Sequence, residues 1–151
     1  MAHGAPGVPD GDRAWAFRAL GLSFLLGALV DGGFGLAILL AQEAVAPVLH
    51  VTLPDPRVYL DLCGLFLVAL GGLYVLVWRD PRRLAPVAAV AILLRYGGLA
   101  LFAVDVLLRR ADLFFLVIAL VDGALATLHL VLLRAAAGGL LPALLRRDPV
   151  Q

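Results

Sequence analysis

Three ionisable residues lie near the middle of long apolar stretches of the sequence: Asp31, Arg95 and Asp122. A charged side chain near the centre of a membrane span is costly, and it commonly marks a binding site, a proton pathway or a paired partner. Counted from the nearer end of its stretch, each residue lies at a depth of about 15–17 Å. Because these depths match, we expect Arg95 to pair with Asp122 and Asp31 to face the same interior.

Two kinds of role fit this cluster. Two carboxylates would share one guanidinium, which keeps its proton, so the site could titrate at mid-membrane and serve a proton-coupled transporter or bind a ligand. The alternative, which we favour, is a buried pair that fixes helix register and the choice of partner helix. Gly27, Asp31 and Gly35 are four residues apart and share one helix face, which favours close approach of another helix. We expect Gly97 and Gly98 to allow the same close approach in another span.

A second group of carboxylates lies near the other end of two spans. Asp61 falls in the first turn of its span, and Asp105 falls in the last turn of the next. Charges so near a span end can reach water, and we favour that interpretation. The alternative is a polar cavity that opens outward and takes a cation.

The remaining reactive residue types exclude several chemistries. Cys63 is the only cysteine, so a thiol oxidoreductase with paired cysteines is ruled out. His3, His50 and His129 lie at different depths, and we predict no metal site, no haem and no other cofactor. Ser23 is the only serine, and we expect no histidine at its depth for proteolysis. We expect His129 to be a hydrogen-bonded packing residue.

The composition predicts the elements that position these residues. Of 151 residues, 63% are apolar and 15% are charged, and the mean hydropathy is +1.01. A soluble domain has about 45–50% apolar and about 25% charged residues. Four apolar stretches, 14–41, 58–78, 84–108 and 113–133, are long enough to cross a bilayer as helices. We therefore predict an all-α fold: a membrane-spanning, antiparallel four-helix bundle.

The segments between the spans give the boundaries. We predict a disordered cytoplasmic N-terminus over 1–13, a transmembrane domain over 14–134 and a cytoplasmic or interfacial tail over 135–151. The longest loop is predicted over 42–57. Asp55, Asp80 and Asp112 precede the last three spans, and aspartate is a good N-cap, so we expect each of them to cap a helix.

The arginines predict the orientation. Eight arginines lie on the side that holds both termini and three lie on the other side, which places both termini in the cytoplasm. All twelve basic residues are arginine and none is lysine, a bias typical of GC-rich bacterial coding sequences. We therefore expect a multi-pass protein of the bacterial cytoplasmic (inner) membrane.

One stretch carries a family resemblance. The segment 64–74, which reads Gly-Leu-Phe-Leu-Val-Ala-Leu-Gly-Gly-Leu-Tyr, is followed by Asp-Pro-Arg at 80–82. It resembles the small four-helix bacterial membrane proteins of the DoxX-like type. The resemblance implies the architecture and carries over no functional residue. A more distant analogy, to the sterol-isomerase-like four-helix fold, implies a cavity for a hydrophobic molecule with buried acids as catalysts.

Three functions fit these observations. We favour a non-catalytic accessory or structural subunit of a larger membrane complex, because few polar residues line the spans and Asn and Lys are absent from the sequence. This function predicts a fully paired Arg95 and an apolar surface covered by other membrane subunits or a second copy. A binding protein or isomerase for a lipid-soluble molecule predicts a cavity beside Asp31 and Asp122. A small proton-coupled transporter predicts a titrating Asp31 with access to water. Besides the lipid bilayer and such subunits, we expect no nucleic-acid partner.

Overall fold

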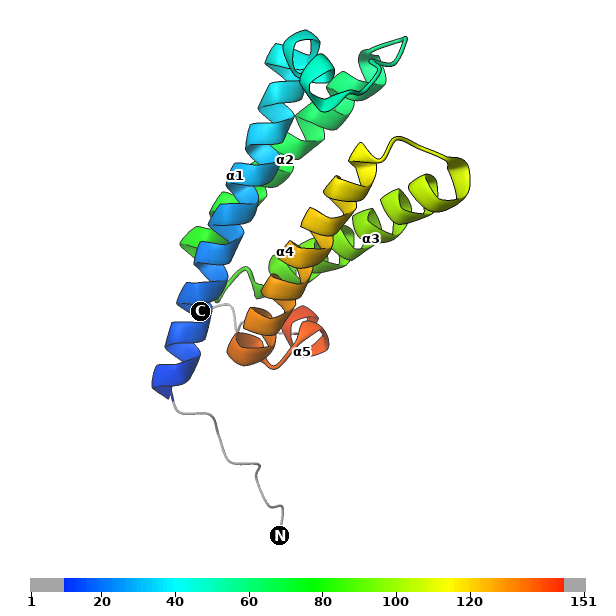
Figure 1. The fold of residues 1–151 in the computed structure, drawn as a ribbon. Helices are drawn as coiled ribbons and strands as arrows, with labels where there is room; N and C mark the ends of the chain where they lie inside the picture. The colour runs from blue at the N-terminus through cyan, green and yellow to red at the C-terminus, as the bar shows by residue number, and fades with distance from the viewer. Residues whose placement is uncertain (1–9, 146–151) are drawn as a thin grey trace.

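The fold is a bundle of long helices. The computed structural model describes residues 10–145, and this part of the chain contains no strand. Its helices are α1 (Asp10–Leu49), α2 (Val58–Arg79), α3 (Ala85–Arg109), α4 (Phe114–Ala137) and the short α5 (Leu140–Leu144) (Figure 1). The all-α prediction is confirmed. The predictions for 1–9 and 146–151 lie outside the described residues.

The first helix is longer than predicted at both ends. It begins at Asp10, so residues 10–13 are helical rather than disordered, and the negative side chain of Asp12 favours a helix N-terminus. It also continues to Leu49, so the loop predicted over 42–57 begins only after that residue. Ala41 (φ −141°, ψ 19°) breaks the helical geometry, and an alanine-rich turn resumes after it despite Pro47. The helix is therefore kinked rather than ended.

The prediction that Asp55, Asp80 and Asp112 cap their helices was wrong, since the N-cap positions are Arg57, Leu84 and Leu113. The Asp80 carboxylate accepts the backbone N–H of Arg83 at 3.1 Å, in the turn that precedes α3. Asp55 and Asp112 do not cap their helices, because the N-cap positions of α2 and α4 fall one or two residues later and carry no side-chain cap bond. The Asp112 carbonyl instead accepts the N–H of Phe115 in a tight turn.

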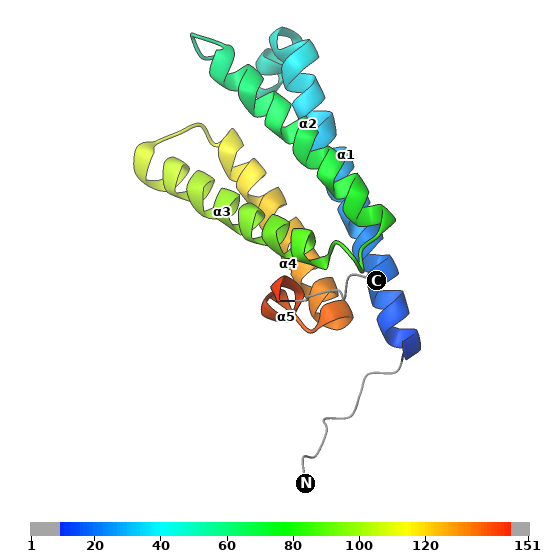
Figure 2. The same cartoon turned by 180° about the vertical axis from the view of Figure 1, so that it is seen from behind.

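The helices form two antiparallel hairpins, α1–α2 and α3–α4 (Figures 1 and 2). Packing of α1 against α4 joins the hairpins, whereas α2 and α3 barely touch although they are consecutive. The short helix α5 packs against α3 and α4 at one end of the bundle, which we call the α5 end. The hairpins diverge toward the opposite end, where the α1–α2 and α3–α4 connections lie (Figure 1).

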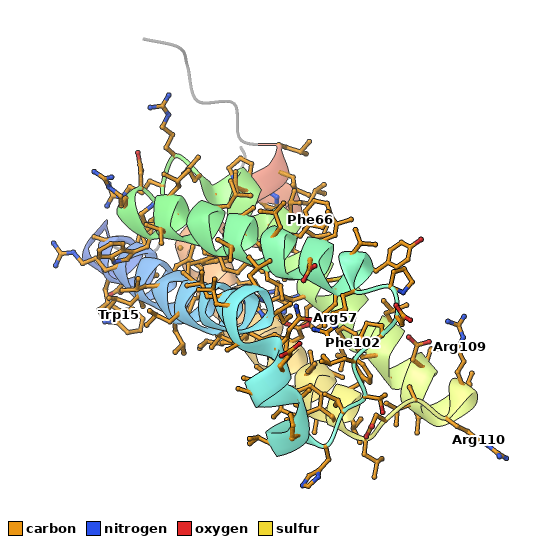
Figure 3. All side chains as sticks on the ribbon, turned by 90° about the horizontal axis from the view of Figure 1, so that it is seen from above. Trp15, Arg57, Phe66, Phe102, Arg109 and Arg110 are labelled. Atoms are coloured by element: carbon orange, nitrogen blue, oxygen red, sulfur yellow. The ribbon has the colours of Figure 1, made fainter. Side chains whose placement is uncertain are left out.

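The core occupies the half of the bundle nearer α5. Its largest fully buried side chains include Leu20, Phe24, Tyr74, Ile92 and Leu133, which come from all four long helices. The outer faces carry many exposed apolar side chains, and Arg109 and Arg110 project from the far end of α3 (Figure 3). Each of the helices α1 to α4 has the length and the apolar composition needed to span a membrane. Apolar side chains lie on both the inside and the outside of the bundle.

Glycines bring α1 and α2 together. A Cβ on Gly35 would lie 2.7 Å from the carbonyl oxygen of Gly64, and a Cβ on Gly71 would lie 3.1 Å from the backbone of Gly32. Such a distance leaves no room for a side chain, so the two backbones touch directly. The predicted packing role of the face that holds Gly27 and Gly35 is confirmed.

Candidate functional site

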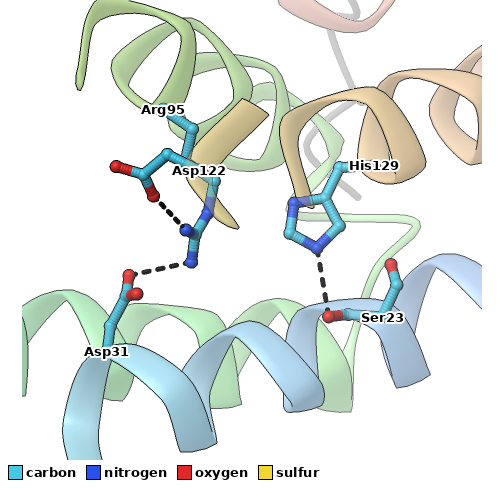
Figure 4. A network of polar contacts seen from close by, with 5 residues as sticks. All are labelled: Ser23, Asp31, Arg95, Asp122 and His129. Carbon is cyan, nitrogen blue, oxygen red and sulfur yellow. Dashed lines mark hydrogen bonds and ion pairs between the residues drawn. The ribbon is translucent and has the colours of Figure 1, made fainter. Parts of the chain in front are cut away.

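Arg95 links three helices in the middle of the bundle. Its Nη1 donates to Oδ1 of Asp122 at 2.6 Å, and its Nη2 donates to Oδ2 of Asp31 at 2.9 Å (Figure 4). The Arg95 side chain is 3% exposed, compared with 9% for Asp31 and 19% for Asp122. The predicted Arg95–Asp122 pair forms, and Asp31 shares the same guanidinium. We call these three residues the Arg95 cluster.

The topology explains why these residues meet. Arg95 lies near the middle of α3 and Asp122 lies in the first half of α4, and the antiparallel hairpin brings them level. Asp31 comes from α1, which packs against α4. Both hairpins therefore contribute to the cluster. The Arg95–Asp31 pair links one hairpin to the other, and the Arg95–Asp122 pair joins the two helices of the second hairpin. Charge-assisted hydrogen bonds of this kind are stronger than neutral ones.

Two glycines leave room for the cluster. A Cβ on Gly27 would lie 3.2 Å from Arg95 Nη2, and a Cβ on Gly98 would lie 2.8 Å from Asp122 Oδ2. The spacing of Gly27 and Asp31 on one face indicated the first of these contacts. We expected Gly98 to help another helix approach; in the structure it makes room for the carboxylate of Asp122.

Tyr74 is a member of the site that sequence reasoning missed. Its ring lies below the guanidinium, with 5.2 Å between the Arg95 Cζ and the ring centroid, and the residue is fully buried. A cation held over an aromatic face is stabilised by the ring. Among the described residues, neither the Tyr74 hydroxyl nor the Arg95 Nε has a hydrogen-bond partner. The signal in the sequence was a lone tyrosine in the second half of an apolar span.

His129 occupies a second polar position nearer the α5 end. Its Nε2 donates to the Ser23 carbonyl at 3.0 Å, and its ring stacks on Phe24 with 4.1 Å between centroids (Figure 4). The predicted role as a hydrogen-bonded packing residue is confirmed. The expectation that no histidine lies level with Ser23 was wrong. The Ser23 hydroxyl, however, donates to the Leu20 carbonyl at 2.7 Å, so the imidazole bonds the backbone of Ser23 and not its hydroxyl.

The structure does not bring the secondary candidates together. Asp61 accepts from Gln42 Nε2 at 3.1 Å, and Asp105 accepts from Arg109 Nη1 at 2.8 Å. Each carboxylate therefore bonds within its own hairpin, at the end where the hairpins diverge. Within residues 10–145, no three His, Cys, Asp or Glu residues are grouped to hold a metal ion.

A surface ion pair closes the α1–α2 connection. Arg57 Nη1 donates to Glu43 Oε1 at 2.6 Å, and both side chains are largely exposed. This hydrogen bond to the carboxylate raises the pKa of Arg57 above its ordinary value, so the guanidinium stays charged. Arg57 also lines a hollow of about 370 Å³ beside the kink in α1, together with residues 39–44.

A second hollow, of about 330 Å³, lies at the α5 end between Arg13 of α1 and the end of α4. Neither hollow includes Asp31 or Asp122. Neither hollow is therefore the cavity that a binding protein would need beside these two carboxylates.

No family model matches the chain, and no curated protein or solved structure is significantly similar to it. The functional argument therefore depends on the geometry of the Arg95 cluster and on the apolar surface around it. The resemblance to DoxX-like proteins stays a prediction.

Proposed function

We propose that this chain is a multi-pass protein of the bacterial cytoplasmic membrane and a non-catalytic accessory or structural subunit of a larger membrane complex. In this proposal α1 to α4 span the bilayer as an antiparallel bundle with both termini in the cytoplasm. The architecture is that of the DoxX-like four-helix proteins. The observation that carries the proposal is the double ion pairing of Arg95, to Asp31 in the other hairpin and to Asp122 in its own.

The pairing of Arg95 favours a structural role. Both terminal nitrogens of the guanidinium bind carboxylates, one from α1 and one from α4. A transporter would need water at this site to exchange protons, whereas the Arg95 and Asp31 side chains are almost completely buried. In lipid, apolar surface gives little drive for helix association, so polar contacts and close packing must join the hairpins. The cluster meets that need.

The outer surface favours a role within an assembly. Leu65, Phe66 and Leu73 of α2 are exposed, as are Leu101 and Leu107 of α3. Each of these side chains requires lipid or another protein around it. Because α2 and α3 make few contacts with each other, their apolar faces remain open to other membrane subunits or to a second copy of this chain.

The arginines support the orientation. Arg13, Arg79 and Arg134 lie at the α5 end, together with Arg18, Arg82 and Arg83, whereas Arg57, Arg109 and Arg110 lie at the opposite end. The positive-inside rule then assigns the α5 end to the cytoplasm.

Native mass spectrometry after purification in mild detergent tests the proposed role. We compare the wild type with Asp31→Asn, and we use Asp61→Asn as a matched control at the far end of α2. Stable co-purifying subunits in all three samples are the expected result. A lone chain or a homodimer that carries a lipid-like adduct, lost only in Asp31→Asn, would overturn the accessory role and make Asp31 part of a binding site.

Thiol labelling tests the orientation separately. In a Cys63→Ala background, we expect Thr52→Cys to react with a membrane-impermeant maleimide in intact spheroplasts. Arg82→Cys should react only after the membrane is permeabilised. The reverse pattern would refute the cytoplasmic assignment of the α5 end without bearing on the role of Arg95.

A binding protein or isomerase for a lipid-soluble molecule is the second candidate, and one observation favours it. The buried Tyr74 hydroxyl and Arg95 Nε have no hydrogen-bond partner within residues 10–145, and an unpaired buried polar group is costly. A hydroxyl or carbonyl group of a bound molecule would supply the missing bond. In that case Tyr74→Phe should weaken the adduct in the native spectra.

A further inference from the structure

The hollow at the α5 end has the chemistry of an anion site. It lies where α1 begins and α4 ends, and its volume is about 330 Å³. Arg13 contributes a guanidinium from the first hairpin and Arg134 contributes one from the second. The rest of the lining is apolar or backbone, namely Ala135, Ala136, Ala137, Gly138 and Pro142. Two positive charges thus face one concave surface, and the described residues that line it include no carboxylate.

No carboxylate among residues 11–145 forms an ion pair with either of these charges, those of Arg13 and Arg134. At the opposite end, by contrast, Arg57 is paired with Glu43 and Arg109 is paired with Asp105. The two ends therefore differ in whether carboxylates neutralise their arginines, and not only in the number of arginines.

The end of α4 is shaped to leave the hollow open. Gly138 adopts a left-handed conformation (φ 85°), and its N–H donates to the Arg134 carbonyl at 3.0 Å. The chain turns there into α5. At least one of the carbonyls at the end of α4, that of Arg134, is therefore hydrogen-bonded within the turn. The arginine side chain at 134 remains exposed on the same turn.

The surroundings of the hollow fit a lipid. Trp15 and Trp78 are exposed at this end, as expected for aromatic side chains at a membrane–water interface. Leu141, Leu144 and Leu145 are exposed around α5, whereas Ala143 is buried against the bundle. A basic site bordered by apolar side chains can take a phosphate and the acyl chains attached to it. Free phosphate would use only the arginines.

We propose that this hollow binds the phosphate of an anionic phospholipid headgroup, held between Arg13 and Arg134. The lipid would then connect the first and second hairpins at the end where α1 and α4 meet, which adds a second link between them beside the Arg95 cluster. The inference depends on the proposed membrane location and not on the accessory role.

The test is lipid retention by the purified chain in native mass spectrometry, with phosphatidylglycerol or phosphatidylcholine added to the detergent. The variant is Arg13→Ala with Arg134→Ala, and the matched control is Arg109→Ala with Arg110→Ala, which removes two charges at the opposite end. Each basic residue near a phosphate is expected to contribute about five-fold, so the apparent affinity of the variant for phosphatidylglycerol should fall about 30-fold. The control should bind as the wild type does. Circular dichroism verifies that all variants are folded.

Three results would overturn the inference. The first is equal retention of phosphatidylglycerol and phosphatidylcholine by the wild type. The second is the same loss in the control as in the variant, which would show an effect of overall charge. The third is displacement of the lipid by millimolar inorganic phosphate, which would make the hollow a site for free phosphate. If the chain co-purifies with partner subunits but retains no lipid, only this inference is refuted. If the chain retains lipid but has no partner, only the accessory role is refuted.

Discussion

Replacing Arg95 with Met measures how strongly the cluster stabilises the bundle. The change removes two charge-assisted hydrogen bonds, of 2.6 Å to Asp122 and 2.9 Å to Asp31. Each such bond contributes about 1.5–3 kcal/mol. Removal of one partner of a buried ion pair destabilises proteins by about 3–5 kcal/mol, because the remaining charge stays buried. We therefore expect Arg95→Met to lower the free energy of unfolding by about 3–5 kcal/mol.

The assay is reversible unfolding in mixed micelles with increasing SDS, followed by circular dichroism. The control is a triple variant in which Arg95→Met is combined with Asp31→Asn and Asp122→Asn. It leaves no uncompensated charge, so its stability should return to within about 1–2 kcal/mol of the wild type. A loss below about 1 kcal/mol for Arg95→Met would refute the idea that the cluster stabilises the bundle. A triple variant as unstable as the single one would assign the loss to poor packing of Met against Tyr74.

Three further predictions use the same unfolding assay. Gly35→Ala should lower the free energy of unfolding by about 1–3 kcal/mol, because its Cβ would meet the Gly64 carbonyl at 2.7 Å. Gly72→Ala is the control, because a Cβ at this position meets nothing within 4 Å, and it should leave stability unchanged or raise it by up to about 1 kcal/mol. Equal effects at both glycines would contradict direct contact of α1 with α2. His129→Ala should destabilise by about 2–4 kcal/mol, because it leaves a cavity beside Phe24; a neutral result would mean that the stacked ring contributes nothing. Arg57→Ala should leave the unfolding midpoint unchanged, because its ion pair is exposed, and a clear shift would show that the pair orders the α1–α2 connection.

The sequence was sufficient to predict the pairing in the Arg95 cluster. Depth within an apolar span can be counted from the residues alone, and consecutive antiparallel helices place equal depths side by side. Rotation about the helix axis cannot be counted in this way. Helices that are apolar on every side carry no stripe to show which face turns inward. Tyr74 was missed for that reason, and Gly98 was assigned to helix packing instead of to the carboxylate of Asp122.

Errors at helix ends explain the rest. The depth of Ser23 and that of His129 were counted from residues 14 and 133, whereas α1 begins at Asp10 and α4 ends at Ala137. Each end was placed four residues short, and the helices do not end at one level (Figure 1). Two residues that were judged to differ in depth therefore meet. The kink at Ala41 was not predicted because three prolines in the segment 42–57 favoured a loop over a second helical turn.

The position of the cluster in the bundle connects the stability argument with the proposed role. Arg95 is the last buried residue of α3, and every other buried residue of that helix lies between it and the α5 end. Beyond the cluster the hairpins diverge (Figure 1), and Phe34 of α1 still contacts Phe114 of α4 there, with 6.4 Å between the ring centroids. Since lipid gives little drive for association of apolar helices, the ion pairs are placed where the packed core ends. The outer halves of α2 and α3 then keep exposed apolar faces, such as those of Leu62 and Leu101, that another membrane subunit could cover without disturbing the core.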